Sequence, residues 1–400
     1  MLERSYKYIV VGGGLAGASA LDAIRESDPN GPLLLIGAEN HLPYDRPPLS
    51  KSLWFGRKQP RDVILHDRPW YLNRGIELVQ ATRVVALDAG QKRIIDERGH
   101  VYRFDKLLLA TGGTPRRLTI PGGELPDICY YRGMDDYLRI HRLAAQAQSA
   151  SVVGGGFIGS ELAAALCHIG LAVTMIFPGQ YLCQRVFPES LGRALSDKYR
   201  QRGVEIWYDD TLVAIARDNS GFLLRTRAGR ELRCDLVIVG IGIDPEVGLA
   251  RQAHLQITNG IEVNERLQTS HPDIYAAGDN ARFWYEALQR RTRVEHWDNA
   301  LSQGRTAGRN MAGAREQYTH MPYFFSDLFE FGYEAVGEID STLTTVADWK
   351  KEHDTGTIYY LRDESVRGVM LCNIWDKVDW ARGLIRRGEV IAPAQLGTVV

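Results

Sequence analysis

Two glycine-rich segments of the same design constrain this chain more than any other feature. Each has an apolar stretch, a Gly-x-Gly-x-x-Gly turn and a segment rich in alanine and leucine with helical periodicity. In this strand–turn–helix pattern, the glycines allow a tight turn and let a pyrophosphate approach the helix N-terminus. One such motif can arise for steric reasons alone, but two in matching contexts predict that the chain binds two dinucleotides. The segments are residues 8–17, with Gly12, Gly14 and Gly17, and residues 151–161, with Gly154, Gly156 and Gly159.

The bulk composition excludes several other classes of protein. A chain of 400 residues exceeds what one core usually covers, so two or three domains are expected. A net charge of −1 gives no basic footprint for nucleic acid or an anionic membrane. No apolar run reaches the roughly 18 residues that span a bilayer. The five cysteines are scattered, and the N-terminus leaves no room for a targeting peptide. We therefore expect a cytoplasmic protein with no nucleic acid partner, no membrane span and no metal site.

The first fingerprint opens a unit of alternating strands and helices. Strands are expected at 8–11 and 33–36, with a helix at 15–26 between them. Glu39 follows about 20 residues after the last fingerprint glycine, where an acid accepts hydrogen bonds from an adenosine ribose. A solvated loop glutamate is the alternative interpretation. A buried strand at 106–109 then ends in a turn containing Thr111 and Gly112, which can pass closely over a ligand.

The second fingerprint opens a similar unit, with a helix expected at 157–169 and a strand at 172–177. At the end of such a strand, an NAD site normally carries an acid and an NADP site an arginine. Neither is present here, and Arg185 is the nearest positive residue. It can equally be a surface residue, so the sequence leaves the phosphorylation state of the nicotinamide cofactor open. Gly242 closes this unit after a strand at 236–239.

The remaining chain adds a polar turn, a helix and a mostly β region. Asp279 follows Gly278 at the end of a short apolar strand, where it can accept hydrogen bonds from a polyol chain or cap a helix. A helix is expected over 295–311. The last 80 or so residues show the alternation and aromatic content of an antiparallel sheet, which we expect to end in a helix near 376–387.

Together these motifs resemble the glutathione-reductase-like flavoproteins, and more narrowly the oxygenase-type ferredoxin reductases and apoptosis-inducing factor. Besides the fingerprints, the resemblance is carried by Tyr-Asp-Arg-Pro-Pro-Leu-Ser-Lys at 44–51, Ala-Thr-Gly at 110–112 and Ala-Ala-Gly-Asp at 276–279. The C-terminal third leans towards the apoptosis-inducing factor group through segments at 294–300, 326–328, 332–337 and 360–363. The sequence departs from that pattern in three ways. From its N-terminal residues we expect no mitochondrial leader, it lacks a long insertion between 345 and 356, and it has Phe325 where a tryptophan is expected.

The resemblance implies an α/β fold with two Rossmann-like dinucleotide-binding domains of the glutathione-reductase type and a C-terminal α+β domain. It implies a discontinuous FAD-binding domain formed by residues 1–116 and 245–315. Residues 117–244 are then the NAD(P)H-binding domain, and residues 316–400 are the C-terminal domain.

The resemblance also assigns the cofactor sites. The residues implied for FAD are Gly12, Gly14, Gly17, Glu39, Arg46, Pro47, Lys51, Thr111, Gly112, Arg116, Gly278, Asp279, Glu295, His296 and Trp297. The residues implied for NAD(P)H are Gly154, Gly156, Phe157, Ile158, Gly159, Glu161 and Gly242. The helix near Glu295 would aim its positive N-terminus at the flavin pyrimidine and stabilise the reduced flavin. Phe157 and Phe325 are candidates for stacking near the two reacting rings, and core packing is the alternative for Phe325.

Lys51 and Glu161 are the predicted catalytic residues. The resemblance pairs them near the reactive edge of the flavin. In a dry site, such a pair fixes both groups and sets the field around flavin N5, where hydride arrives. The alternative is an ordinary salt bridge between domains.

We therefore expect an FAD-dependent NAD(P)H oxidoreductase resembling apoptosis-inducing factor, with NADH as the favoured donor. Hydride would pass from nicotinamide to flavin N5 with a charge-transfer complex, and electrons would pass to oxygen, a quinone or a small redox protein. The chain has no closely spaced cysteine pair and no cysteine in the 41–51 loop, which argues against a disulfide reductase, a peroxidase or a water-forming oxidase.

Two alternative functions remain at this stage. The first is a ferredoxin or rubredoxin reductase, which would dock an acidic carrier at Arg290, Arg291 and Arg293 unless these form a solvated face. The second is a flavin redox sensor that switches homodimerisation or partner binding.

Overall fold

The computed structural model describes residues 3–388, and its chain divides into two compact units. Each unit collects segments that are distant in the sequence. Unit 1 consists of Met1–Asp45, Arg61–Thr114 and Pro245–Pro322, and unit 2 consists of Arg46–Pro60, Pro115–Asp244 and Tyr323–Val400. The strands β7 (Gly113–Pro115) and β16 (Ile243–Pro245) carry the chain between the units.

Unit 1 is built on a mainly parallel sheet in the order β3-β2-β1-β6-β5-β4, with β19 also pairing with β6. All four residues of β2 are buried, as expected for a parallel strand covered on both faces. The parallel strands are β1 (Glu3–Val11), β2 (Leu33–Ile36), β3 (Ile76–Val79), β6 (Val101–Leu109) and β19 (Ile274–Ala276), and β4 (Val84–Asp88) and β5 (Arg93–Asp96) form an antiparallel hairpin.

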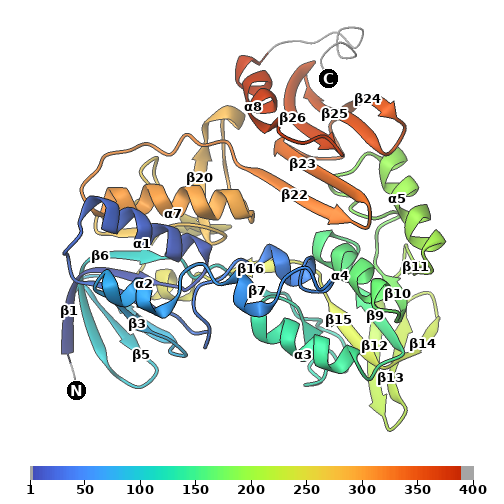
Figure 1. Ribbon diagram of the computed structural model, residues 1–400, viewed down its shortest axis with the longest axis horizontal. Helices are drawn as coiled ribbons and strands as arrows, with labels where there is room; N and C mark the ends of the chain where they lie inside the picture. Colours follow the sequence, from blue (N-terminus) through green and yellow to red (C-terminus); the bar gives the residue numbers. More distant parts are fainter. Residues whose placement is uncertain (1–2, 389–400) are drawn as a thin grey trace. The chain divides into compact units, whose positions relative to one another are not determined.

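Two helices of unit 1 pack backbone against backbone. Helix α1 (Leu15–Ser27) and helix α7 (Trp297–Met311) lie side by side (Figure 1). A Cβ added to Gly304 of α7 would lie 2.2 Å from the carbonyl oxygen of Ala16, so only glycine permits this approach. The other elements of unit 1 are α2 (Arg68–Asn73), α6 (Gly248–Gln252), β17 (Ile257–Thr258), β18 (Gly260–Glu262), β20 (Ala281–Tyr285), β21 (Arg290–Thr292) and the short 3₁₀ turns η2 (Pro60–Val63, reaching into unit 2) and η3 (Glu286–Leu288).

Unit 2 contains a second parallel sheet, in the order β11-β10-β9-β15-β8, and a three-stranded antiparallel sheet, β12-β13-β14. An apolar cluster between these sheets includes Val153, Phe222 and Val237. The elements are η1 (Pro47–Ser50), β8 (Cys129–Tyr130), α3 (Met134–Ala144), β9 (Ser149–Val153), α4 (Phe157–His168), β10 (Ala172–Ile176), α5 (Glu189–Gln201), β11 (Glu205–Trp207), β12 (Leu212–Asp218), β13 (Gly221–Thr226), β14 (Glu231–Cys234) and β15 (Leu236–Val239).

The C-terminal part of unit 2 is an antiparallel sheet in the order β22-β23-β26-β25-β24, with helix α8 packed on β23 and β26. Tyr333, Tyr359 and Tyr360 are fully buried in its core. A tight turn joins β24 to β25, so no long insertion separates them. The elements are β22 (Tyr323–Leu328), β23 (Phe331–Gly337), β24 (Thr344–Lys351), β25 (Thr355–Arg362), β26 (Ser365–Cys372) and α8 (Val378–Arg387).

Two elements differ from those expected from the sequence. The helix expected from Glu295 begins at Trp297, because His296 is extended and acts as its N-cap. Helix α5 was not predicted, although Leu191, Leu195 and Tyr199 form a buried stripe with helical spacing.

Candidate functional site

The turn of the first fingerprint joins β1 to α1 at the carboxyl edge of the unit 1 sheet. Gly12 has a φ of 118°, and a Cβ there would lie 2.1 Å from the carbonyl oxygen of Ala110. A Cβ on Gly17 would lie 2.1 Å from the carbonyl oxygen of Gly12. Gly14 differs, because an added Cβ would meet nothing within 4 Å and its backbone is extended. Gly12 and Gly17 are therefore required by packing, whereas Gly14 faces open space at the N-cap of α1.

The three glycines of the second fingerprint have the same structural roles as those of the first. Gly154 has a φ of 124°, and its Cβ would lie 2.4 Å from the carbonyl oxygen of Gly240. A Cβ on Gly159 would lie 2.1 Å from the carbonyl oxygen of Gly154, while one on Gly156 would meet nothing within 4 Å. In both turns the uncapped N-terminus of a helix faces open space behind a glycine, which is the geometry that accepts a pyrophosphate. The residues present therefore fit two dinucleotides.

Two further turns lie beside the first fingerprint in unit 1. Strand β19 pairs with β6 so that Ala276 lies opposite Leu109, which brings Thr111 and Gly278 to the same edge of the sheet. The side chain of Asn280 donates to the carbonyl oxygen of Leu109 at 3.1 Å and to Thr111 Oγ1 at 2.9 Å. The backbone N–H of Gly278 donates to Gln303 Oε1 at 2.8 Å. Sequence analysis missed both amides; their position beside the Gly-Asp turn and in a helix rich in small residues was the available signal.

The N-terminus of α7 gathers polar groups in the same unit. Arg293 donates to the backbone oxygen of Asp279 at 2.8 Å and pairs with Glu295 at 2.6 Å. Trp297 Nε1 donates to Asp45 Oδ1 at 2.7 Å. Burial lowers the pKa of His296 to about 4, although the negative charges of Asp279 and a second nearby acid act to raise it. His296 is therefore neutral at physiological pH and adds no positive charge to that of the helix end.

Glu39 follows β2, as expected of a residue near the ribose end of a dinucleotide site. Its Oε2 atom accepts a hydrogen bond from the hydroxyl of Tyr44 at 2.5 Å, and its backbone oxygen accepts one from the N–H of Ala81 at 3.1 Å. These contacts fix the loop and the direction of the carboxylate. Its proposed ribose role remains a prediction.

A buried polar cluster in unit 2 contains both predicted catalytic residues. Lys51 Nζ lies 2.6 Å from Glu161 Oε1, and their side chains are 14% and 4% exposed. Glu161 also accepts hydrogen bonds from Ser50 and from Ser326, which lies on β22. Lys51 lies over the ring of Phe325, with Nζ 5.7 Å from the ring centroid. The carboxylate is thus held by donors from two distant segments of chain and is locked in one orientation.

Neighbouring groups tune the electrostatics of this cluster. Burial raises the pKa of Asp327, an effect that Lys51 opposes and Glu161 reinforces. The hydroxyl of Tyr131 donates to the backbone oxygen of Leu49, which anchors the segment that carries Lys51.

Other predicted residues of unit 2 also have defined positions. Arg46 donates to the backbone oxygen of Arg132 at 2.9 Å, and Pro47 begins the 3₁₀ turn η1. The backbone N–H of Arg116 donates to the oxygen of Gly242 at 3.0 Å, and its side chain donates to Asp244 at 2.9 Å. Of the predicted FAD set, Arg46, Pro47, Lys51 and Arg116 belong to unit 2 and the others to unit 1.

Aromatic residues surround the start of α4. Phe157 lies 5.5 Å from Phe324 and 6.3 Å from Tyr333, measured between ring centroids. Ile158 is among the exposed large hydrophobic residues, at 39%. Phe157 therefore packs in an aromatic cluster, and Ile158 offers an apolar contact beside the second fingerprint.

The end of β10 carries no acid, as expected from the sequence, but the structure brings one close. Phe177 and Pro178 follow the strand, and the ring of Phe177 lies under Gly155. The backbone N–H of Asp209, which comes from the end of β11, donates to the oxygen of Gly179 at 3.1 Å. Asp209 is exposed, so the structure brings an acidic residue near the strand end.

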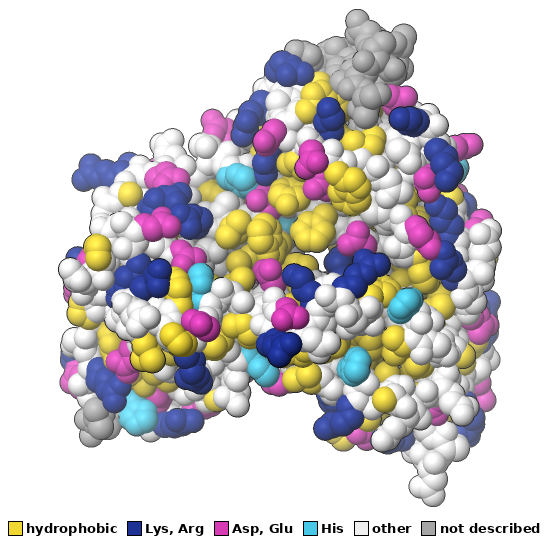
Figure 2. Space-filling model, in the orientation of Figure 1, with side chains coloured by type: hydrophobic (Ala, Val, Ile, Leu, Met, Phe, Trp, Pro, Cys, Tyr) yellow, Lys and Arg dark blue, Asp and Glu magenta, His cyan; other side chains and the backbone are white. Residues whose placement is uncertain are grey.

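The surface shows no large single-sign patch on the face seen in Figure 2, where basic and acidic side chains are interspersed. The suggested docking arginines are partly neutralised. Arg291 pairs with Glu262 at 3.1 Å and Arg293 with Glu295 at 2.6 Å. This cluster therefore presents less positive charge to an acidic carrier than the sequence indicates.

Two absences hold for the part of the chain that the structure describes. Across residues 3–388, no helix is long and apolar enough to cross a membrane. Within the same range, no group of three or more His, Cys, Asp or Glu residues is arranged to hold a metal ion.

The comparisons with known proteins decide the family. The family described as pyridine nucleotide-disulphide oxidoreductase matches residues 6–304. The chain belongs to this family. A second description, apoptosis-inducing factor, mitochondrion-associated, C-term, matches residues 307–357.

Several relatives are similar over almost the whole chain. A protein named apoptosis-inducing factor 1, mitochondrial, from Dictyostelium discoideum is 33% identical over 97% of this chain and 80% of its own length. The ferredoxin–NAD(+) reductase component of an anthranilate 1,2-dioxygenase system from Burkholderia cepacia is 32% identical over 97% of this chain and 96% of its own.

Solved structures give the same result. The putidaredoxin reductase–putidaredoxin complex matches with a TM-score of 0.91 and 29% identity over 98% of this chain and 95% of that one. The ferredoxin reductase for the CYP199A2 system of Rhodopseudomonas palustris matches with a TM-score of 0.92 and 27% identity over 98% of both chains.

These findings confirm the predicted fold class and the predicted class of activity. The chain is an FAD-dependent NAD(P)H oxidoreductase with a mixed α/β fold, and FAD and NAD(P)H are its cofactors. The three domain boundaries and the roles of individual residues remain predictions.

Proposed function

We propose that this oxidoreductase takes hydride from NADH and passes electrons from FAD directly to an external acceptor, without a cysteine relay. The observation that supports this route is the state of the cysteines. All five are free, and Cys129, Cys183, Cys234 and Cys372 are buried. Burial raises the pKa of Cys183 and of Cys234 to about 12, so neither is a thiolate at neutral pH. The chain therefore offers no reactive thiol pair to carry the electrons.

We propose that the chain's own residues bind and orient the two dinucleotides. The open N-termini behind Gly14 and Gly156 receive the pyrophosphates of FAD and of NADH, respectively. Asp279 binds the ribityl chain of FAD. When bound, FAD supplies a hydride acceptor at its N5 atom. Lys51 and Glu161 are the proposed catalytic pair, because a buried cation held by a fixed carboxylate supplies a preorganised field.

The preference for NADH rests on Asp209. A carboxylate beside the end of β10 accepts hydrogen bonds from ribose hydroxyls and repels a 2′-phosphate. Replacing Asp209 with arginine tests this role. The ratio of kcat/KM for NADH to that for NADPH should fall by about tenfold or more, since one unfavourable charge contact is replaced by a favourable one. An unchanged ratio would remove Asp209 from the proposal.

An anaerobic titration of the purified protein with NADH, and then with NADPH, tests the proposed route. A long-wavelength charge-transfer band that persists for many seconds in air supports the type of reactivity implied by the likeness to apoptosis-inducing factor. Rapid bleaching without that band, discharged quickly by added ferredoxin, supports the alternative below. Flavin that NADH leaves oxidised contradicts both.

The alternative is a reductase for a ferredoxin or rubredoxin. It is favoured by relatives such as the rubredoxin–NAD(+) reductase of Pseudomonas putida, 32% identical over 83% of this chain and 86% of its own. In this case, carrier reduction should be faster at low salt, because electrostatic steering of an acidic protein is screened by ions. A flavin-controlled homodimer is a third proposal, and sedimentation before and after anaerobic reduction tests it: an unchanged size would exclude it.

A further inference from the structure

The turn that carries Asp279 is held by a glutamine of α7. Gln303 is fully buried, and its Oε1 atom accepts the backbone N–H of Gly278 at 2.8 Å. Gly278 has a φ of 85° and lies against Ala16 at the start of α1. Because Gly304 packs directly on the backbone of Ala16, the backbone of α7 next to Gln303 is held close to α1. The Gly278–Asp279 turn is thus fixed relative to the helix that opens the first fingerprint.

A second amide fixes the turn at the end of β6. Asn280 is fully buried, and its Nδ2 atom donates to the oxygen of Leu109 and to Thr111 Oγ1. Thr111 in turn donates to the backbone oxygen of Glu246 at 2.7 Å. Asn280 therefore ties the turn that carries Asp279 to the turn that carries Thr111.

Each of the two amides has one polar atom without a hydrogen-bond partner in the described part of the chain. Gln303 Nε2 and Asn280 Oδ1 are buried, and neither has a hydrogen-bond partner among residues 3–388. Buried polar atoms are almost always hydrogen-bonded, because leaving one without a partner costs free energy. A donor and an acceptor placed beside the first fingerprint are suited to the hydroxyls and phosphate oxygens of a dinucleotide, either directly or through water.

We propose that Gln303 and Asn280 are FAD-positioning residues. Together they hold Asp279 and Thr111 in place beside the glycine turn. Gln303 Nε2 and Asn280 Oδ1 acquire hydrogen-bond partners when FAD is bound. This inference rests on FAD as the cofactor of unit 1 and adds residues that the fingerprint itself does not identify.

Two substitutions at one position separate the two contributions of Gln303. Gln303→Met keeps the length of the side chain but removes both the acceptor for Gly278 and the Nε2 donor. Gln303→Glu keeps an acceptor for the N–H of Gly278 and replaces the Nε2 donor with a carboxyl oxygen, which also introduces an ionisable group at a fully buried position. We expect FAD to bind about tenfold or more weakly to the methionine variant, and several-fold more weakly to the glutamate variant.

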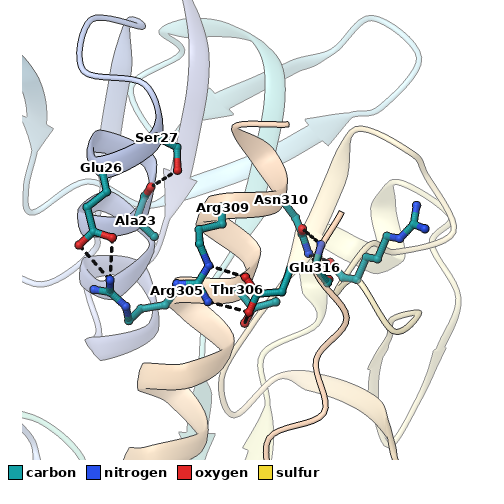
Figure 3. Close-up of polar contacts among 9 residues, drawn as sticks. Ala23, Glu26, Ser27, Arg305, Thr306, Arg309, Asn310 and Glu316 are labelled. Atoms are coloured by element: carbon teal, nitrogen blue, oxygen red, sulfur yellow. Dashed lines mark hydrogen bonds and ion pairs between the residues drawn. The ribbon is translucent and has the colours of Figure 1, made fainter. Parts of the chain in front are cut away.

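Asn310 supplies a matched control on the same helix. It is buried, donates to the backbone oxygens of Arg266 and Glu316, and accepts the backbone N–H of Glu316 at 2.8 Å (Figure 3). Asn310→Leu removes more hydrogen bonds than either change at Gln303 but none that reaches the Gly278 turn. It should therefore lower the resistance of the protein to urea while leaving FAD affinity within about twofold of the unaltered protein.

The experiment measures FAD release from the purified holoprotein by flavin fluorescence on dilution, the visible circular dichroism of the bound flavin, and unfolding in urea. The proposal is supported if both Gln303 variants release FAD more readily and alter the flavin dichroism, while Asn310→Leu changes only the urea midpoint. It is overturned if Gln303→Glu, shown by urea unfolding to be folded, binds FAD with unchanged affinity and dichroism. It is also overturned if Asn310→Leu weakens FAD binding as much as Gln303→Met does.

Discussion

Replacing Gly156 with alanine should separate dinucleotide binding from folding. Gly156 has φ and ψ of −86° and −168°, an extended conformation that any residue adopts, and an added Cβ meets nothing within 4 Å. A glycine-to-alanine change at such a position stabilises a protein by about 0.4–1 kcal/mol, because it restricts the unfolded chain. The folded protein should therefore tolerate the new methyl group and unfold at the same or a slightly higher urea concentration.

The same methyl group occupies the space through which a pyrophosphate approaches the start of α4. Loss of a hydrogen bond from a backbone N–H to a charged phosphate oxygen costs about 1.5–3 kcal/mol. That range corresponds to an affinity for NADH about 10- to 100-fold weaker. The FAD content should not change, because Gly156 belongs to the second fingerprint and FAD is assigned to the first.

Gly159 provides the contrasting variant. A Cβ at this position would lie 2.1 Å from the oxygen of Gly154, so Gly159→Ala forces the backbone to shift. Overpacking of this kind costs about 1–3 kcal/mol. Urea unfolding should therefore show that Gly156→Ala is the more stable of the two variants. Calorimetric titration should show that this more stable variant still binds NADH weakly. If Gly156→Ala binds NADH as the unaltered protein does, the assignment of the second fingerprint is wrong.

Three further predictions follow from the same structure. Gly14→Ala should weaken FAD binding by about 10- to 100-fold while leaving the urea midpoint of the FAD-free protein unchanged. Flavin fluorescence measures the binding, and co-purification of stoichiometric, tightly held FAD would count against the prediction. Lys51→Met leaves the buried carboxylate of Glu161 without its cation and should lower the free energy of unfolding by about 3 kcal/mol. This is near the low end of the usual range, because two hydroxyl donors to Glu161 remain. The double variant with Glu161→Gln should recover much of the lost stability, and urea unfolding of both variants tests this. The pKa of His296 lies below its unfolded value, so the unfolded state takes up the proton first and stability should fall as the pH drops from about 6.5 towards 4; His296→Gln should flatten this part of the urea-midpoint profile, and an equally steep profile would show that another group titrates.

The regular α/β parts of the fold could be predicted because their signals are local. Glycine spacing and buried apolar runs indicated β1, α1, β9 and α4, with helix starts that agree with the structure. The start of α7 was placed too early. A residue type alone does not tell whether that residue is the extended N-cap or already part of the helix.

The candidate site could be predicted only where one motif defines it. The fingerprint glycines and Asp279 are motif residues, and the pairing of Lys51 with Glu161 was implied by family resemblance. Ser326 contacts Glu161 across 165 positions of sequence, and Asn280 reaches Thr111 across 169. Contacts of this range depend on the register of strands that pair only in the folded chain, so spacing along the sequence could not reveal them.

The central step of the proposed reaction is direct hydride transfer from the nicotinamide to FAD in a single protein chain. The most direct test is anaerobic stopped-flow reduction with saturating NADH that carries deuterium at the transferred position of C4. The visible absorbance band of the oxidised flavin should bleach in a single reaction with one NADH per FAD, and deuterium should slow this reaction. Bleaching at the same rate with hydrogen and deuterium would contradict direct hydride transfer.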